Sequence, residues 1–197
     1  MENTESKSSL PAAPNYTLED LDRIDDFRES IIDFEKQLVS FEGSYGDPST
    51  PGQSEDANKI NPLNHTFAGG CYVREISMPK GQLISTDIHK KEHPFFILKG
   101  DVSVLSDTGV VRITAPYSGV TQPGTKRKIL LVKRRSVEPG TKRLIYINED
   151  TIWATVHATD KKTVEDVIPD IIAKDFSDPE VCLEKARKML RIKTNKS

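Results

Sequence analysis

Short apolar runs separated by turn residues fill the middle of the chain and restrict its fold most strongly. Between residues 61 and 159 these runs are rich in Val, Ile, Tyr and Phe, with Gly, Pro or Asp between them. They are Cys71 to Ser77, Leu83 to His89, Pro94 to Leu98, Val102 to Leu105, Val110 to Ala115, Lys128 to Lys133, Arg143 to Asn148 and Ile152 to His157. Such spacing predicts a mainly β fold, either a sandwich or a barrel. Asp107-Thr108-Gly109 predicts a hairpin turn in which the glycine takes a positive φ.

The segments before residue 61 predict a disordered tail, a helix and a flexible linker, followed by a single β domain. Residues 1–16 are rich in Ser, Glu, Pro and Ala and are expected to be disordered. Residues 17–42 carry apolar side chains at spacings of three and four, which predicts an amphipathic helix with Thr17 as its N-cap. This helix is expected to cover one side of the β domain or to pair with its copy in a dimer. Residues 43–60 contain few apolar side chains and predict a flexible linker.

The last part of the chain, residues 161–197, predicts helical structure followed by a basic tail. Its first apolar stretch is expected to break at Pro169, because proline cannot donate the hydrogen bond that a helix interior needs. A second helix is expected over residues 179–191, since Ser and Asp precede a proline at its start. Val181 and Leu183 in this helix are expected to face the β domain.

Two of the four histidines lie close together between Gly81 and Gly100. Because successive residues of a strand point to opposite sides, Asp87 and His89 share one face of a predicted strand. His93 begins the next strand after a turn, so its side chain is expected to converge with theirs. Imidazole and carboxylate groups on neighbouring strands are suitable ligands for iron, manganese or zinc. The stretch therefore predicts a pocket for a metal ion or a small ligand.

This stretch resembles the first signature of the cupins, which reads glycine, five residues, His-x-His, three or four residues, glutamate, six residues and glycine. The frame here reads Gly81, five residues, Asp87-x-His89, three residues, His93, six residues and Gly100. Asp87 stands where the first histidine would be, and His93 stands where the glutamate would be. The second signature is matched only by the proline and glycine of residues 115–122, and no histidine follows them. The resemblance implies a single jelly-roll barrel, and degenerate cupins often bind ligands without catalysis.

His157 ends the last predicted strand and, in a jelly roll, would supply the imidazole that the second signature lacks. The metal ligands implied are His89, His93 and His157 with Asp87 or Glu92 as the carboxylate, and the metal is Fe, Mn, Ni or Zn. A lone strand histidine is more often a hydrogen-bonded structural residue than a ligand. Four other residues have candidate roles nearby: His65 in capping the entry loop of the barrel, and Tyr117, Tyr146 and Arg143 in lining the pocket.

A longer resemblance, over residues 61–160, is to small cupin-type proteins encoded by tailed bacteriophages. It rests on Asn61-Pro62-Leu63-Asn64-His65, Tyr72-Val73-Arg74-Glu75-Ile76, Pro116-Tyr117, Pro-Gly-Thr-Lys-Arg and Glu149-Asp150-Thr151-Ile152-Trp153. This resemblance implies the fold and a phage origin, and we know of no established activity for that group.

The segment Pro123-Gly124-Thr125-Lys126-Arg127 recurs as Pro139-Gly140-Thr141-Lys142-Arg143. Each copy precedes an apolar run, which predicts an inserted hairpin near residues 124–142, with the second copy leading into the native strand. Lys and Arg are concentrated between residues 126 and 143, and a basic arm of this kind can bind phosphate backbones. Aromatic residues that could stack on bases are absent from the arm before Tyr146. A solvated hairpin whose charges protect a strand edge is the alternative interpretation.

The charge balance excludes a global attraction to nucleic acid or anionic membranes, because the formal net charge is -2. Nucleic acid is therefore expected only at the basic hairpin. No apolar run approaches the roughly 20 residues that span a bilayer, and the N-terminus lacks a basic segment followed by an apolar one. These features predict a cytoplasmic protein, in the host cytoplasm or the virion if a phage encodes it. Cys71 and Cys182 are expected to be free thiols in a reducing compartment.

Three functions are consistent with these residues. The first is a cupin that binds a divalent metal or small ligand without catalysis, as a phage accessory or virion-associated protein. The second is a metal-dependent cupin enzyme of dioxygenase, isomerase or lyase type that acts on a small carbonyl or sugar-like compound. The third is an interaction protein that docks on a larger assembly through its N-terminal helix and basic hairpin. A homodimer is expected by analogy with cupins.

Overall fold

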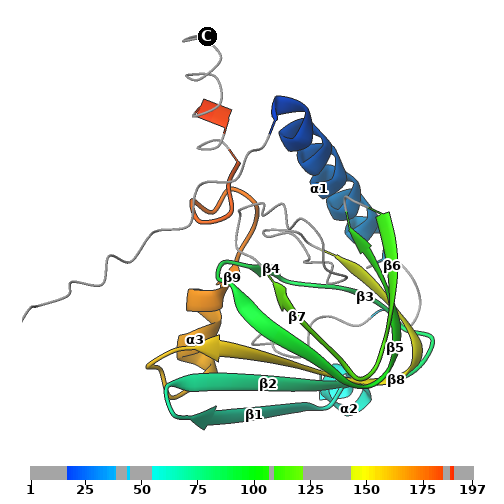
Figure 1. Ribbon diagram of the computed structural model, residues 1–197, viewed down its shortest axis with the longest axis vertical. Helices are drawn as coiled ribbons and strands as arrows, with labels where there is room; N and C mark the ends of the chain where they lie inside the picture. The colour runs from blue at the N-terminus through cyan, green and yellow to red at the C-terminus, as the bar shows by residue number, and fades with distance from the viewer. Residues whose placement is uncertain are drawn as a thin grey trace, which may run out of the picture.

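The computed structural model describes residues 17–38, 44, 55–106, 109–121, 143–183 and 187–188. These residues form a mainly β protein, as the sequence predicts (Figure 1). The helices are α1 (Leu18–Leu38), α2 (Glu55–Ile60) and α3 (Val164–Ile171). The strands are β1 (Leu63–Ala68), β2 (Cys71–Met78), β3 (Leu83–Ser85), β4 (Ile88–His89), β5 (His93–Ser106), β6 (Gly109–Thr114), β7 (Tyr117–Thr121), β8 (Leu144–Ala158) and β9 (Ile172–Ala173).

One antiparallel sheet is built around the two longest strands, β5 and β8. Its strand order is β1-β2-β8-β5-β6, with β3 also paired to β8 and β7 also paired to β5. Strands β4 and β9 form a separate two-stranded sheet. Within the described residues the end strands β1 and β6 each pair on one side only, so the main sheet is not the closed barrel that the sequence analysis expected. The expected strand 128–133 and the rest of the basic hairpin lie outside the described residues.

Two pairs of predicted strands are each one continuous strand that bends. The runs 94–98 and 102–105 join in β5, and the runs 143–148 and 152–157 join in β8. The register between β5 and β8 shifts around Gly100, which marks a β-bulge, and bulges bend strands. Figure 1 shows both strands turning through this bend. Each long strand therefore pairs with different neighbours along its two halves: β5 with β7 and then β6, and β8 with β3 and then β2.

Side chains on the inner face of the bent sheet form the main core. Alternate residues of β5, beginning with His93, Phe95 and Ile97, are buried while their neighbours are exposed. This is the period of two that a strand imposes. The buried members of the cluster are Met78, Phe95, Ile97, Val102, Val104, Ile113, Ile145, Ile147 and Trp153. Strands β1 and β7, which the sequence analysis did not predict, extend this face at its two sides.

Helix α1 begins where the sequence predicts. The Thr17 Oγ1 atom accepts a hydrogen bond from the Asp20 backbone N–H at 3.0 Å, and the Thr17 N–H donates to Asp20 Oδ2 at 3.1 Å. Each residue thereby satisfies a backbone donor of the other at the helix start. The helix is described as far as Leu38, so the rest of the predicted range 17–42 lies outside the described residues.

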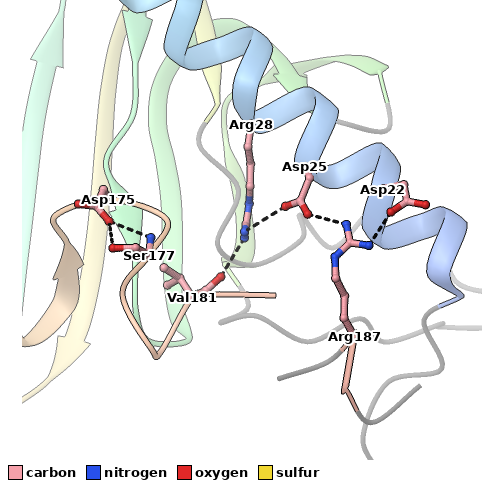
Figure 2. Close-up of polar contacts among 7 residues, drawn as sticks. All are labelled: Asp22, Asp25, Arg28, Asp175, Ser177, Val181 and Arg187. Carbon is pink, nitrogen blue, oxygen red and sulfur yellow. Dashed lines mark hydrogen bonds and ion pairs between the residues drawn. The ribbon is translucent and has the colours of Figure 1, made fainter. Parts of the chain in front are cut away.

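The partner of α1 is the part of the chain that follows α3, as Figure 2 shows. Arg28 is 4% exposed, and its guanidinium donates to the Val181 carbonyl at 3.1 Å. The same guanidinium lies 4.4 Å from the centre of the Phe176 ring. Leu183 packs with two residues of α1 rather than on the main sheet, which corrects its predicted contact. A hydrogen bond from Ser85 in β3 to Glu35 also ties α1 to the main sheet.

Three predictions for the flanking segments are wrong in part. The expected linker 43–60 contains α2, whose last turn carries Lys59, a positive charge that suits the C-terminal end of a helix dipole. Helix α3 continues through Pro169 and ends two residues later. Residues 179–183 form turns rather than the start of a helix. The predicted tail 1–16 and the basic tail after residue 190 lie outside the described residues.

Replacing Gly100 by alanine is expected to destabilise the protein strongly. Gly100 has φ +96°, and a Cβ atom there would lie 2.7 Å from the Thr151 Cα atom, with backbone and side-chain atoms of β8 nearer still. Gly81 has a similar φ of +87° but no atom within 4 Å of such a Cβ, so Gly81→Ala is the matched control. We expect Gly100→Ala to lower the free energy of unfolding in urea by about 2 kcal/mol or more beyond the control. Equal losses in the two variants would contradict the steric explanation.

Removing the buried guanidinium of Arg28 is expected to weaken the docking of α1. Arg28→Met leaves the Val181 carbonyl without this donor, and an unsatisfied buried acceptor costs about 1–3 kcal/mol. Arg23→Met is the control, because the Arg23 side chain is 46% exposed and pairs with Asp20 on the same helix. Urea unfolding of the two variants measures the difference. A loss in Arg23→Met as large as that in Arg28→Met would count against this role of Arg28.

Candidate metal centre

Three histidines meet at one end of the inner face. His89, His93 and His157 each place a ring nitrogen within 4.8 Å of one from each of the others. The ring centres are 4.3 Å apart for His89 and His93, 4.3 Å for His93 and His157, and 5.6 Å for His89 and His157. Zinc–imidazole bonds are roughly 2.0–2.1 Å long, so nitrogens bound to one ion lie at most about 4.2 Å apart, and a small closing movement of the rings would bring all three to that separation. We call these three residues the histidine cluster.

The pairing of β5 with β8 brings two members of the cluster together. Phe95 in β5 pairs with Thr155 in β8. His93 lies two residues before Phe95, and His157 lies two residues after Thr155. Because the strands are antiparallel and side chains alternate, His93 and His157 fall on the same face and in the same row across the sheet. Tyr72 in β2 and Thr121 in β7 flank them in that row.

The third member depends on the C-terminal segment, by which we mean residues 161–183. His89 lies in β4, where it pairs with Ile172 of β9. The next residue, Lys90, donates its backbone N–H to the Ile171 carbonyl at 2.8 Å, and its ammonium group lies 2.9 Å from Asp178 Oδ2. The C-terminal segment therefore holds His89 over the end of the inner face.

The hydrogen bonds of the cluster leave a ring nitrogen of each histidine without a partner among the described residues. His93 Nδ1 lies 3.0 Å from the Lys91 carbonyl oxygen. A carbonyl only accepts, so Nδ1 carries the proton and Nε2 keeps its lone pair, as in metal sites where a backbone carbonyl fixes the tautomer. The buried Nδ1 atoms of His89 and His157 have no hydrogen-bond partner among the described residues. Buried polar atoms are nearly always paired in folded proteins, so these two are suited to an additional ligand.

Burial keeps the cluster neutral. His93 and His157 are 2% and 3% exposed, and desolvation disfavours the charged imidazolium. Desolvation is the largest cause in each case and lowers the pKa of His93 to about 4 and that of His157 to about 3. Desolvation and then the neighbouring His93 and His157 hold the pKa of His89 well below its ordinary value. Neutral imidazoles are the form that binds metals.

Two arginines act on the histidines: Arg143, which the sequence suggested as a pocket residue, and Arg74, which the sequence did not connect with them. Arg74 in β2 pairs with Thr155, one row along the inner face from His157, and its positive charge lowers the pKa values of His89 and His157. Arg143 lowers those of His89 and His93. Arg143 is only 5% exposed, so this end of the predicted basic hairpin is buried rather than solvated. The alternation of β2 marks Arg74 as inward-facing, a signal that the sequence contained.

The other predicted site residues lie outside the histidine cluster. Asp87 is not a member of the cluster, because the expected strand 83–89 is interrupted after Ser85 and Asp87 lies between β3 and β4. Glu92 is exposed. His65 is in β1 rather than in an entry loop, and its Nδ1 lies 2.8 Å from the Tyr72 hydroxyl. Tyr117 packs against the core and Tyr146 is 46% exposed, so neither residue lines the cluster.

A surface groove of about 750 Å³ lies elsewhere, at the bend of the main sheet. Its lining residues are Lys80, Lys99, Gly100, Asp101, Arg112, Thr114, Glu149 and Asp150. These side chains carry both signs of charge, and Asp101 is held by Arg112 at 2.7 Å and by Asn148 at 2.7 Å. These internal hydrogen bonds give the polar residues of the groove a structural role. The histidine cluster is therefore the stronger candidate for a functional site.

Comparisons with known proteins were made for the whole chain. No protein-family model matches it, and no curated protein matches it. Several solved structures similar to it are cupin-domain proteins. The cupin domain of Cnp3 from Schizosaccharomyces pombe has 18% identity and a TM-score of 0.36, over 57% of this chain and 72% of that one. A cupin 2 domain-containing protein from Halorhodospira halophila has 15% identity and a TM-score of 0.37, over 57% and 72%.

A cupin superfamily protein from Desulfitobacterium hafniense has 9% identity and a TM-score of 0.37, over 51% of this chain and 78% of that one. At these TM-scores the similarity carries no argument about function, so the interpretation of the site depends on its own geometry. The described helices include none that is both long and apolar enough to cross a membrane.

Acid is expected to destabilise the metal-free protein through the cluster. The unfolded chain protonates its histidines near pH 6.5, whereas folded His157 and His93 stay neutral down to about 3 and 4. The unfolded state therefore binds more protons between these values, and the free energy of unfolding falls as pH falls from 6.5 to about 4. His157→Gln should make this dependence shallower by up to about 1.4 kcal/mol per pH unit. Urea unfolding at several pH values tests this, and equal slopes in the two proteins would contradict it.

Proposed function

We propose that this protein binds one divalent transition metal ion through His89, His93 and His157, in a site of the cupin type. The observation that carries the proposal is the approach of three imidazoles, those of His93 and His157 buried and that of His89 half-buried, within 4.8 Å of one another. Structural histidines normally donate and accept hydrogen bonds, yet two of these rings keep a buried Nδ1 atom without such a partner among the described residues. The tautomer set at His93 leaves the Nε2 lone pair of a third ring for a metal.

The donor set narrows the choice of metal. All three members of the group are histidines, and imidazole suits zinc, iron, nickel and copper. Manganese and magnesium prefer carboxylate, carbonyl and water oxygens. Among the metals expected from the sequence, zinc, ferrous iron and nickel therefore fit the cluster better than manganese.

Three protein ligands also favour an open coordination position. Structural zinc sites are closed by four protein ligands, whereas catalytic sites have three and leave the fourth to water or substrate. A metal held here would polarise a carbonyl oxygen or activate a bound water. This geometry supports ligand binding at the metal, and it keeps a metal-dependent cupin enzyme as the second candidate.

Metal binding by the purified protein tests the proposal. Metal-free protein titrated with Co²⁺ should bind one equivalent and develop visible absorption bands of a site with nitrogen ligands. Single variants His89→Ala, His93→Ala and His157→Ala should each weaken Co²⁺ binding by more than about 100-fold, the upper range for the loss of an outer-shell partner. His65→Ala is the matched control, because His65 bonds Tyr72 and is not a member of the cluster. Unchanged affinity in the three cluster variants would refute the site.

A further inference from the structure

The stretch from Thr86 to His93 is joined to the main sheet at its two ends. Thr86 donates its backbone N–H at 2.9 Å to the carbonyl of Arg143, which immediately precedes β8, and His93 begins β5. Between these ends, β4 pairs with β9 and, among the described residues, with no strand of the main sheet. His89 is therefore the member of the histidine cluster whose strand is held by the C-terminal segment, whereas His93 and His157 lie in the paired strands β5 and β8.

Lys90, the neighbour of His89, joins this stretch to the C-terminal end of α3. Its backbone N–H donates to the Ile171 carbonyl at 2.8 Å, and its ammonium group donates to the Pro169 carbonyl at 3.1 Å. The last carbonyls of a helix have no partner within the helix, and a positive charge beside them suits the helix dipole. The last turn of α3 contains no basic residue of its own. Lys90 therefore supplies the donors and the charge that suit this helix end.

The same ammonium group reaches a second part of the C-terminal segment. It lies 2.9 Å from Asp178 Oδ2, and the side chains of Lys90 and Asp178 are 15% and 17% exposed. Glu180 Oε1 is more distant, at 3.9 Å, on an exposed side chain. Because the charges of Lys90 and Asp178 are largely removed from water, each is costly when unpaired, unlike the charges of an exposed ion pair. We call the contacts of Lys90 with Pro169, Ile171 and Asp178 the Lys90 bridge.

The C-terminal segment packs beside two of the three candidate ligands. Tyr72, which pairs with His157 across β2 and β8, is fully buried and packs against Val167 of α3. Ile88, which precedes His89 in the chain, packs against Ala173 of β9. The docking of this one segment therefore affects both sides of the cluster.

We propose, on the basis of the metal function above, that the Lys90 bridge positions His89 for metal binding, and that metal binding in turn holds the C-terminal segment in its docked place. The site has all three imidazoles only while the segment is docked, because β9 is the strand with which β4 pairs. A metal that binds the docked form more tightly stabilises docking by the same factor. Lys90 is thus a positioning residue, and the docking of the C-terminal segment depends on metal.

The sign of the effect separates positioning from simple electrostatics. Lys90 carries a positive charge next to a candidate ligand, and a positive charge repels a divalent cation. If charge alone mattered, Lys90→Met would strengthen metal binding. Loss of positioning acts in the opposite direction, so weaker binding in Lys90→Met identifies the bridge.

Co²⁺ titration of the full-length protein tests the positioning role. Lys90→Met and Asp178→Asn should each weaken Co²⁺ binding roughly tenfold or more, as the loss of an outer-shell partner does. Asp178→Asn keeps the Oδ1 acceptor that the Glu180 N–H uses at 3.0 Å, so the main change is the loss of charge. The double variant should lose about as much as Lys90→Met alone, because both changes break the same ion pair. Lys174→Met, at an exposed position of the C-terminal segment, is the matched control and should bind Co²⁺ as the wild type does.

Hydrogen exchange of the wild type, followed by mass spectrometry, tests the reciprocal effect. Co²⁺ at about 100 times its dissociation constant should slow the exchange of the backbone N–H groups that join β4 and β9 by about tenfold or more, because a ligand of the docked form stabilises that form. Strand β6, which pairs with β5 beyond the bend, is the internal control and should exchange equally with and without Co²⁺.

The outcomes separate this proposal from the metal function. If Co²⁺ does not bind to the wild type, the metal function is wrong and the positioning role falls with it. If Co²⁺ binds but Lys90→Met and Asp178→Asn bind it as tightly as the wild type, or if Co²⁺ leaves exchange at β4 and β9 unchanged, the positioning role is wrong and the metal site stands. Circular dichroism of the metal-free proteins checks folding. If Lys90→Met is not folded, Asp178→Asn decides, and the exchange measurement requires the wild type alone.

Discussion

The register between β5 and β8 is the constraint on which the rest of the structure depends. Their backbone hydrogen bonds place Phe95 opposite Thr155, and this pairing puts His93 and His157 in one row on the inner face. A slip of one residue in either strand would turn its histidine to the outer face. The bulge at Gly100 lets the same two strands bend, so that one half of each carries a histidine of the site while both halves contribute side chains to the core.

The position of His89 depends on segments outside the main sheet, namely the C-terminal segment and α1. Ile88, the neighbour of His89, packs with Ala173 and Val181 of the C-terminal segment. The carbonyl of Val181 in turn accepts from Arg28 in α1. A chain of packed residues thus connects the N-terminal helix to the position of His89. The sequence suggested that α1 docks on other molecules. Among the described residues, α1 makes contacts with the C-terminal segment of the same chain.

The electrostatics of the cluster follow from its burial. Desolvation lowers the pKa values of all three histidines, so that each ring offers a lone pair rather than a positive charge. The Lys91 carbonyl fixes which nitrogen of His93 carries the proton.

The sequence by itself determined the mainly β core, because alternating apolar runs and turn residues are local signals. The sequence also predicted the N-cap of α1 and the three histidines as candidate ligands. Two of these histidines lie between Gly81 and Gly100, and the third ends the last predicted strand. Only the tertiary structure decided that Asp87 is left out of the cluster, since a break in the strand after Ser85 has no clear local signal. It alone brought Arg74 to the histidines and β9 to β4, because these are long-range pairings that depend on strand register and on packing of the C-terminal segment.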